Sequence, residues 1–486
     1  MYNRGIRWYK MAEEEALTIY RGPMRVWVSG PSIVEPNERF DIKVSLLRLD
    51  GYLATNYEGE LIVEGGNGIE GLPDTLIFSK DDCGIKVLDN CRVPYEGIFR
   101  FEISPSKGFF PTGCCHPIWA VKRPEYRLFW GDVHVHSVLG RCGSPYLPKS
   151  PDFGYWFARD ILGHDFCSIT DHASLLTDDA WEKIRSSLKR WHSPGRFVTI
   201  LGFETDYDGE DGGHFNIYFP TDNGYFKNFK MEAGGTLNSI FDFTLSSRGI
   251  AVCHHTSRVV CGRDFSKSRF GGLEIEPVME IYSQWGSSEE YESSRPTIEG
   301  RHPSPSHYYR YALKHGFKLG VIGGSDSHCT TPGGSVPMVY PRWGGKQLFP
   351  YPGGVAAIYT NELTRKGLFD ALRARRCYAT SLEKILIWIE AEGMPMGSEI
   401  ESSKVEIDIL VSCTYPPLRE VVIVKNGRVA ARFGKFGKDE GFDSSKRTFR
   451  LTWRDKDFNG ESSYYVRAIQ FDGDLAWSSP IWIRPK

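Results

Sequence analysis

The sequence predicts a multidomain protein of the α/β plus β class, with a central α/β segment between two β-sandwiches. The chain has 486 residues, which suits about three domains. Short apolar runs of alternating pattern fill both ends, whereas strand-like runs alternate with helical patterns in the middle. The predicted domains are therefore residues 1–125, 126–383 and 384–486.

Both end segments are expected to be antiparallel β-sandwiches. Gly, Pro, Asn and Asp separate their apolar runs at the spacing of such a fold. Lys425–Asn426–Gly427 is a hairpin-turn signal in the C-terminal segment. Trp477 and Trp482 are expected to be exposed there. The runs are MRVWVSG, FDIKVSLLRL, GELIVEGG and GIFRFEIS at the N-terminal end, and KILIWIEAEG, KVEIDILVSC and EVVIVKNGRV at the C-terminal end.

The middle segment reads as βαβ units. KGLFDALRARR is an amphipathic helix with Leu368, Phe369 and Leu372 on one face, and FGYWFARDILG has the same helical spacing. The apolar strands FCSIT, RFVTILGFE, GIAVCHH and KLGVIGGSD each end in polar residues. This alternation predicts a parallel sheet, open or closed as a barrel, whose functional groups gather at strand ends.

Composition narrows the class of partner. The chain carries 59 basic and 61 acidic side chains, and this balance argues against nucleic acid as a partner. No apolar run reaches the roughly 18 residues of a membrane span, and the N-terminus has no apolar core of a signal peptide. Eleven cysteines without a CxxC pattern are typical of reduced thiols. We expect a cytoplasmic protein.

Histidines and carboxylates concentrate at strand ends in the middle segment. Of 13 histidines, 12 fall between His134 and His328. His134 and His136 lie two apart on a strand, so both rings face one side. A core would favour apolar groups there, because unpaired buried charges are costly. A mixed set of imidazoles and carboxylates suits Zn, Mn or Fe, and Glu204 among imidazoles could bridge two ions. The six motifs are FWGDVHVHS, SITDHAS, LGFETDY, DGGHFNIYF, GIAVCHHTSR and VIGGSDSH.

These motifs, in this order, resemble the polymerase and histidinol phosphatase (PHP) superfamily of metal-dependent hydrolases. The phrases CHHTS, EIYSQWGSSE and LFDALRARRCYAT resemble a branch known as a domain of unknown function, DUF3604. The resemblance covers residues 126–383. It implies a distorted (β/α)7 barrel that hydrolyses an ester by a metal-bridged hydroxide in a di- or trinuclear site.

The resemblance also implies a ligand set for two or three divalent ions (Zn, Mn or Fe). Glu204 would bridge the first ion to the second. The second ion would take only one of the adjacent His254 and His255, because adjacent side chains of a strand face opposite ways. This does not settle which of the two it is, and His254 is the one favoured here. The residues implied are His134, His136, Glu204 and Asp326 for the first ion, His214 and His254 or His255 for the second, and His172 and His328 for the third.

The third ion would need a further ligand. The family usually supplies a His or Asp a few residues after the HxH pair, but this chain has SVLGRCG, which leaves Cys142 as the candidate. A thiolate at this position would favour Zn. The alternative is that Cys142 packs as a small apolar side chain in a loop.

The catalytic group is expected to comprise Glu204, Asp326 and His255, with His255 contacting substrate. Arg258 and Arg141 are candidates for binding an anionic substrate oxygen, since guanidinium suits phosphate. Either arginine could instead form a surface ion pair. The resemblance implies a small-molecule or ester substrate, and a phosphoester is the first expectation. The alternatives are hydrolysis of a carboxylic or carbamate ester, and a protein that binds without catalysis.

Overall fold

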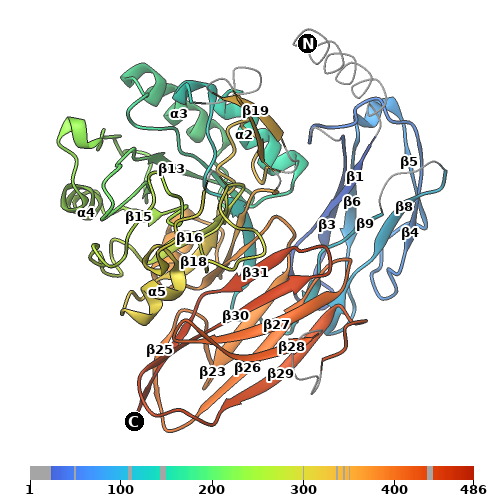
Figure 1. Ribbon diagram of the computed structural model, residues 1–486. Helices are drawn as coiled ribbons and strands as arrows, with labels where there is room; N and C mark the ends of the chain where they lie inside the picture. Colours follow the sequence, from blue (N-terminus) through green and yellow to red (C-terminus); the bar gives the residue numbers. More distant parts are fainter. Residues whose placement is uncertain are drawn as a thin grey trace, which may run out of the picture. The chain divides into compact units, whose positions relative to one another are not determined.

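The structure, a computed structural model, describes residues 23–48, 51–107, 112–142, 149–298, 300–334, 338–342, 345–349, 351–434 and 442–486. The N-terminal stretch predicted to lack the apolar core of a signal peptide, residues 1–22, lies outside the described residues. The chain divides into two compact units (Figure 1). The first is Met1–Pro124 with Ile161–Gly163, and the second is Glu125–Asp160 with His164–Lys486.

The first unit consists of small, mainly antiparallel sheets. On β3, the buried Phe40, Ile42 and Val44 alternate with the more exposed Asp41 and Lys43, as the sequence pattern predicts. The strands pair in the orders β1–β3–β6, β2–β10–β7 and β5–β4–β8–β9. Their bounds are β1 (Arg25–Ser29), β2 (Ile33–Val34), β3 (Phe40–Leu47), β4 (Gly59–Glu64), β5 (Thr75–Phe78), β6 (Ile85–Cys91), β7 (Gly97–Phe99), β8 (Glu102–Pro105), β9 (Gly113–Cys114) and β10 (Ile118–Ala120).

A 13-stranded mixed sheet organises the second unit. Its main path is β15–β14–β13–β12–β11–β21–β22–β31–β30–β27–β28. A separate small sheet has the order β17–β16–β18, and β19 (Met338–Arg342) pairs with β20 (Gly345–Phe349). The other strands between residues 125 and 383 are β11 (Arg127–Asp132), β12 (Phe166–Ile169), β13 (Val198–Glu204), β14 (Phe215–Phe219), β15 (Ile250–Cys253), β16 (Val278–Ser283), β17 (Gly286–Ser287), β18 (Gly320–Gly323), β21 (Val355–Thr360) and β22 (Cys377–Thr380).

Few helices accompany these strands. The α6 helix confirms the prediction for KGLFDALRARR: Leu368, Phe369 and Leu372 are buried, and the Thr364 hydroxyl caps its amino end. The FGYWFARDILG stretch begins as α2 and continues as a π-helical turn at Phe157–Ile161. None of the helices in the described ranges has both the length and the apolar character needed to cross a bilayer. The α-helices are α2 (Pro151–Trp156), α3 (Asp178–Trp191), α4 (Leu237–Ser246), α5 (Tyr309–Lys314) and α6 (Arg365–Arg373).

The expected (β/α)7 barrel in an α/β plus β protein is wrong: the fold is mainly β. In the long sheet, β11, β12 and β13 are parallel neighbours, but β14, β15, β21 and β22 pair antiparallel. The described residues of this segment contain five α-helices rather than seven. The link between β13 and β14, TDYDGEDGGH, is rich in Asp and Gly and makes a hairpin connection without a crossover helix.

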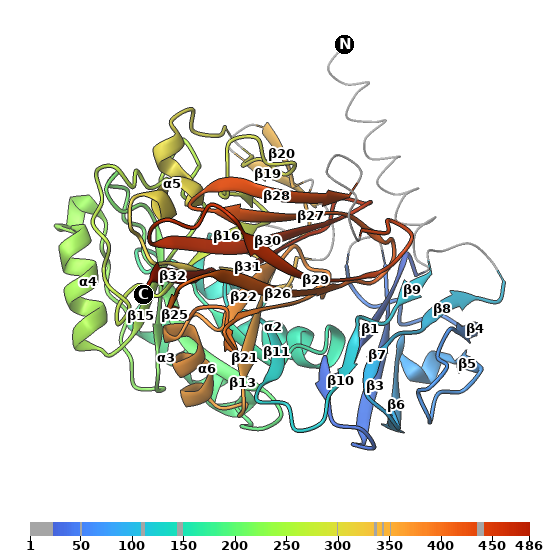
Figure 2. The same cartoon turned by 90° about the horizontal axis from the view of Figure 1, so that it is seen from below.

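The C-terminal strands form a four-stranded sheet, β24–β23–β26–β29, and also extend the long sheet. Figure 2 shows β28, β27 and β30 side by side, in their pairing order. The strands β22 and β31, which lie on opposite sides of residue 383 in the sequence, pair with each other. The domain boundary predicted at residue 383 stays a prediction. The bounds are β23 (Leu386–Ala391), β24 (Met394–Pro395), β25 (Glu399–Ser402), β26 (Val405–Ser412), β27 (Leu418–Lys425), β28 (Arg428–Gly434), β29 (Thr448–Asp455), β30 (Ser462–Gln470), β31 (Leu475–Ser478) and β32 (Ile481–Pro485).

One hydrophobic core joins the middle and C-terminal segments. Tyr282 and Tyr309 of the middle segment belong to the same buried cluster as Trp477 and Trp482. Tyr282 stacks on Trp477 with ring centroids 5.5 Å apart. Trp477 is fully buried and Trp482 is 5% exposed, so the expectation that both are exposed is wrong. The reason is that both side chains enter the core shared with the middle segment, where Trp477 packs against Tyr282.

Candidate metal centre

The predicted ligands lie at one edge of the long sheet, namely the edge that the carboxyl ends of β11, β12 and β13 form. Because β11, β12 and β13 are parallel, their carboxyl ends meet there. The antiparallel β14 begins at that edge, and β15 ends there in turn. A parallel bridge between Val135 and Ser327 places the chain after β18 beside the chain after β11. The polar side chains at these ends are His134, His136, His172, Glu204, His214, His254, His255, Asp326 and His328.

Glu204 presents its two carboxylate oxygens to two different sets of histidines. Oε1 lies 2.7 Å from Nδ1 of His214 and 3.0 Å from Nε2 of His254. Oε2 lies 3.3 Å from Nε2 of His134 and 3.1 Å from Nε2 of His136. Glu204 is 1% exposed, so both sets are gathered around a carboxylate removed from water. This is the arrangement that a carboxylate bridging two cations requires.

Three groups of donor atoms are close enough to hold metal ions. Within each group, one ligand atom from every residue lies within 4.8 Å of the others. Both His254 and His255 enter the second group, so the choice between them stays open. In the described residues these are a first group of His134, His136, Glu204 and Asp326, a second group of Glu204, His214, His254 and His255, and a third group of His136, Cys142, His172 and His328.

Asp326 supplies the second carboxylate of the first group. Its Oδ1 lies 3.1 Å from Nε2 of His136 and 3.5 Å from Nε2 of His134. The backbone of Asp326 is left-handed, with φ 55°, and its N–H donates to the carbonyl of His134 at 2.8 Å. A non-glycine residue in this region is strained and persists where its surroundings hold it, which is typical of functional sites.

Glu280 fixes the orientation of His134. Its Oε2 lies 3.0 Å from Nδ1 of His134, and this contact turns Nε2 of the ring toward Glu204 and Asp326. The carboxyl of Glu280 is 1% exposed, and burial raises its pKa to about 7 although His134 opposes the shift. The lack of a side chain at Gly324 makes room, since a Cβ there would lie 2.7 Å from Cβ of His134.

Asp132 holds the backbone of the site rather than a ring. Its Oδ1 accepts hydrogen bonds from the backbone N–H groups of His134 at 3.0 Å and Ser325 at 2.9 Å. Its Oδ2 accepts from the N–H of Gly333 at 2.6 Å. The buried Asp132 therefore ties the HxH segment to the segment that carries Asp326.

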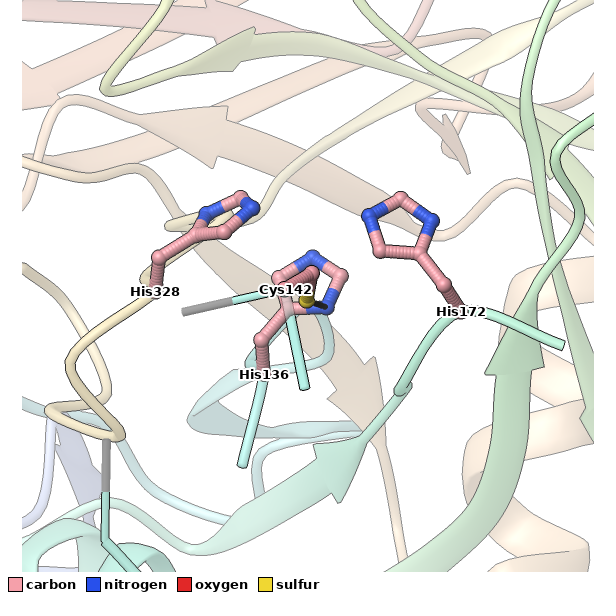
Figure 3. Close-up of side chains that lie close together, drawn as sticks. All are labelled: His136, Cys142, His172 and His328. Carbon is pink, nitrogen blue, oxygen red and sulfur yellow. Dashed lines mark hydrogen bonds between the residues drawn. The ribbon is translucent and has the colours of Figure 1, made fainter. Parts of the chain in front are cut away.

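The third group combines three imidazoles and a thiol, as Figure 3 shows. Sγ of Cys142 lies 3.5 Å from Nδ1 of His136. The ring of His136 lies against those of His172 and His328, with centroids 4.7 Å and 4.2 Å away. The predicted candidate for the third ion thus faces the histidines with which the sequence associated it.

The electrostatics of the site favour bound cations. Burial alone would lower the pKa of His134, but Asp326, Glu280 and Glu204 outweigh it and raise that pKa to about 10. Burial and the neighbouring His134 lower the pKa of His254 to about 4, which leaves His254 neutral, as a ligand must be. Within the described residues, Nδ1 of His254 and of His255 has no hydrogen-bond partner. Neutral nitrogens and carboxylate oxygens are the donors that Zn, Mn and Fe take.

The structure places the two predicted substrate arginines differently. Arg258 is 8% exposed and lies at the second group, where its charge contributes to lowering the pKa of His255 after burial and His254. Its guanidinium lies 4.1 Å from the ring centroid of Trp285, and its Nη1 donates to Sγ of Cys261 at 3.7 Å. Arg141 is exposed and ends the 3-10 turn Val138–Gly140.

Asp206 is the site residue that the sequence reasoning missed. Its Oδ1 lies 2.7 Å from Nδ1 of His172, and its Oδ2 accepts from the N–H of Ser174 at 2.9 Å. The signal was its position two residues after Glu204, which would place both carboxylates on one side if the strand continued. The Asp- and Gly-rich stretch that follows obscures this signal, because such a composition is typical of turns.

Comparisons with known proteins give relatives but no family. No family model matches the chain. An uncharacterized protein of Chlamydia pneumoniae is 27% identical over 480 residues, covering 94% of this chain and 74% of that protein. An uncharacterized protein of Chlamydia muridarum is 26% identical over 484 residues, covering 94% of this chain and 73% of that protein.

Solved structures give only weak likenesses. A Bacteroides uniformis beta-glucuronidase aligns with 95% of this chain at 9% identity and a TM-score of 0.18. The aligned part is 61% of the glucuronidase chain. A structure of PhoD aligns with 39% of this chain and 40% of its own at 9% identity and a TM-score of 0.16. Such scores establish no common fold. What stands is a buried centre with three groups of donor atoms able to hold metal ions.

Proposed function

We propose that this protein is a metal-dependent hydrolase whose ligand set resembles that of the PHP superfamily, although its fold is not the expected barrel, and that it cleaves a phosphoester. The observation that carries the proposal is the position of Glu204, whose two oxygens face separate histidine sets. Two divalent cations held there would activate a water molecule and neutralise charge that develops on the substrate. Metal binding is what the donor groups support directly, whereas hydrolysis and the phosphoester are the further steps proposed.

The surrounding residues have defined tasks in this proposal. His134, His136 and Asp326 hold one cation with Glu204, and His214 and His254 hold the other. Glu280 and Asp132 keep His134 and its backbone in place. The ring of His255 is 4% exposed and its pKa is held low, first by burial and then by His254, so it stays neutral beside the cations.

Arg258 supports a phosphoester over a neutral ester. Stacking on Trp285 limits where its guanidinium can move, and this cation lies at the second group. A guanidinium can donate two hydrogen bonds to the non-bridging oxygens of a phosphate. Arg258→Gln should raise KM for a phosphoester about tenfold or more, since a charge-assisted hydrogen bond contributes about 1.5–3 kcal/mol. It should change KM for a neutral carboxylic ester little.

The test combines metal analysis with a panel of phosphate, carboxylate and carbamate esters. Glu204→Gln should lower the metal content and reduce kcat by more than the roughly 100-fold that changes around a metal site bring. Glu232→Gln, an exposed residue with the same change, is the matched control. Cleavage of only carboxylate or carbamate esters would overturn the phosphoester, and a Glu204→Gln variant with full metal content and full activity would overturn the bridge. Bound metal without any hydrolysis would favour a binding protein.

A further inference from the structure

We propose that the C-terminal strands bind an acidic, extended peptide of a partner protein in a groove between β28 and β29, where the peptide adds a strand to the long sheet. The groove has a volume of about 1540 Å³, and its lining belongs to the second compact unit. None of the described residues that line it belongs to the three donor groups. The inference therefore goes beyond the proposed hydrolysis and does not rest on it.

Both strands present an open edge to this groove. In the part of the chain that the structure describes, β28 pairs only with β27, and β29 pairs only with β26. Consecutive residues of each strand, 428–433 and 451–455, line the groove, so side chains of both sheet faces border it. A groove bordered by both faces of a strand runs along the edge of that strand. The backbone N–H and C=O groups that point outward there are a template on which a further strand can form.

Small side chains leave the edge of β28 accessible, since Ala430 and Ala431 lie in its middle. Apolar surface borders the groove as well. Val429 on β28 is 42% exposed, and Trp453 on β29 is half-buried. Successive side chains of a strand point to opposite sides, so a bound peptide could place every second side chain on this apolar surface.

The two walls of the groove are held in position. A Cβ on Gly427, in the turn before β28, would collide with the carbonyl oxygen of Arg310 in α5, so this turn packs tightly on the helix. At the same end, Nζ of Lys425 lies 2.5 Å from Oδ2 of Asp455 and joins the turn to β29. Edges fixed in this way lose little conformational freedom when a peptide binds, and this favours affinity.

The charge of the groove selects an acidic peptide. Its lining has seven basic and three acidic side chains, although the whole chain has a net charge of −2. Two of the three acids already pair with lysines of the lining. Among the described residues, three of the cations form no ion pair with a carboxylate, namely Lys314 on α5, Arg428 on β28 and Lys456 after β29. These cations come from three separate segments, and a strand that carries carboxylates would supply their counter-charge.

The same charge disfavours a second copy of this chain as the occupant. β28 carries Arg428 and Arg432, and β29 carries Arg450 and Arg454. Pairing of either edge with the edge of another copy would bring like charges opposite each other, which is destabilising. Basic side chains protect an edge from such self-association, whereas an acidic strand meets no repulsion there.

The test uses the full chain and a synthetic peptide of about ten residues in which Glu alternates with Val and Thr. Fluorescence anisotropy should show binding that weakens as the salt concentration rises. Arg428→Glu combined with Lys456→Glu should weaken binding about tenfold or more, because attraction becomes repulsion at two exposed positions. Lys107→Glu combined with Lys227→Glu makes the same change of charge at exposed positions outside the groove and should bind like the wild type.

A second peptide distinguishes strand addition from attraction between charges. N-methyl groups on its central backbone nitrogens keep the carboxylates but block hydrogen bonding along both edges of the peptide. It should bind about tenfold or more weakly than the unmethylated peptide, because the backbone hydrogen bonds are lost. The unmethylated peptide should also slow hydrogen exchange of the amides of β28.

Three results would overturn the inference: no binding of the unmethylated peptide, equal binding of the methylated one, or equal binding by the variant with Glu at 428 and 456. A single-stranded oligonucleotide that binds as tightly as the peptide, and fails to bind the same variant, would show a general polyanion site and would also overturn it. The comparison of the two peptides on the wild type decides even if a variant fails to fold. Esterase activity has no part in these measurements, so their failure and the failure of the proposed function are separate.

Discussion

The indole Nε1 of Trp477 donates a hydrogen bond of 2.8 Å to Oε2 of Glu289. Arg467 donates to the same oxygen at 2.9 Å, and the hydroxyl of Tyr465 donates to Oε1 at 2.7 Å. Glu289 lies in the middle segment and is 1% exposed, whereas these three donors belong to the C-terminal strands β30 and β31. Arg310 of the middle segment also donates to Oε1, at 3.1 Å. A buried charge of one segment is therefore neutralised in part by the other.

Removal of the C-terminal segment should destabilise the rest of the chain. Truncation after residue 383 removes β31 from the edge of β22 and leaves Glu289 without these donors. It also uncovers Tyr282, which stacks on Trp477. We expect insoluble or much less stable protein, measured by expression yield and thermal unfolding. A soluble fragment 1–383 with full activity would show that the C-terminal segment is a detachable module.

Glu289 should make stability depend on pH in acid. Arg467 and Arg310 outweigh burial and lower the pKa of Glu289 to about 2, below the value near 4.3 of an unfolded chain. A lowered pKa contributes stability that is complete above about pH 4.3 and is lost as the pH falls toward 2. Glu289→Gln should destabilise the fold by about 1.5–3 kcal/mol at neutral pH, because the buried Arg467 loses a charge-assisted hydrogen bond and keeps only its ion pairs with Glu290 and Glu420.

Urea unfolding at a series of pH values measures this effect. The difference between the wild type and Glu289→Gln should shrink between about pH 4.3 and pH 2. Glu232→Gln, at an exposed position, should follow the wild type throughout. Equal stability of Glu289→Gln and the wild type at neutral pH would show that the ion pairs of Glu289 do not stabilise the fold.

Glu280→Gln should weaken metal binding without removing a ligand. The amide keeps the size of the carboxylate but loses the charge that holds Nδ1 of His134, so affinity should fall about 10–100-fold. Gly324→Ala should act in the same direction, since its Cβ would meet the carboxylate of Glu280. Competition against a chelator of known affinity measures the change. Unchanged affinity in both variants would reduce Glu280 to a packing role.

Metal binding should release protons. Without metal, His134 has a pKa of about 10 and is protonated at neutral pH, and a ligand must give up that proton. The apparent affinity should therefore rise with pH up to about 10. Calorimetric titration in buffers of different ionisation enthalpy counts the released protons. Binding that releases none between pH 6 and 9 would show that His134 is neutral before the metal arrives.

The residues of the candidate site could be predicted from the sequence better than the fold could. Polar residues after apolar strands, such as His136 and Asp326, are visible because burial makes them costly unless they serve a purpose. The direction of pairing is not visible: β14 is as apolar as β12, yet one is antiparallel and the other parallel to β13. Asp206 was missed for a related reason, since local composition cannot show which ring a loop carboxylate will reach.

The pairing of β22 with β31 has a consequence during synthesis. The two strands are separated by almost a hundred residues, so the ribosome completes β22 well before its partner exists. At about 5–20 residues per second, the edge of β22 waits on the order of 5–20 seconds. All four residues of β22 are buried in the native fold, and its open edge can pair with a strand of another nascent chain in that interval. The middle segment is therefore expected to need a chaperone on the ribosome, and to reach its native sheet only after translation has passed β31.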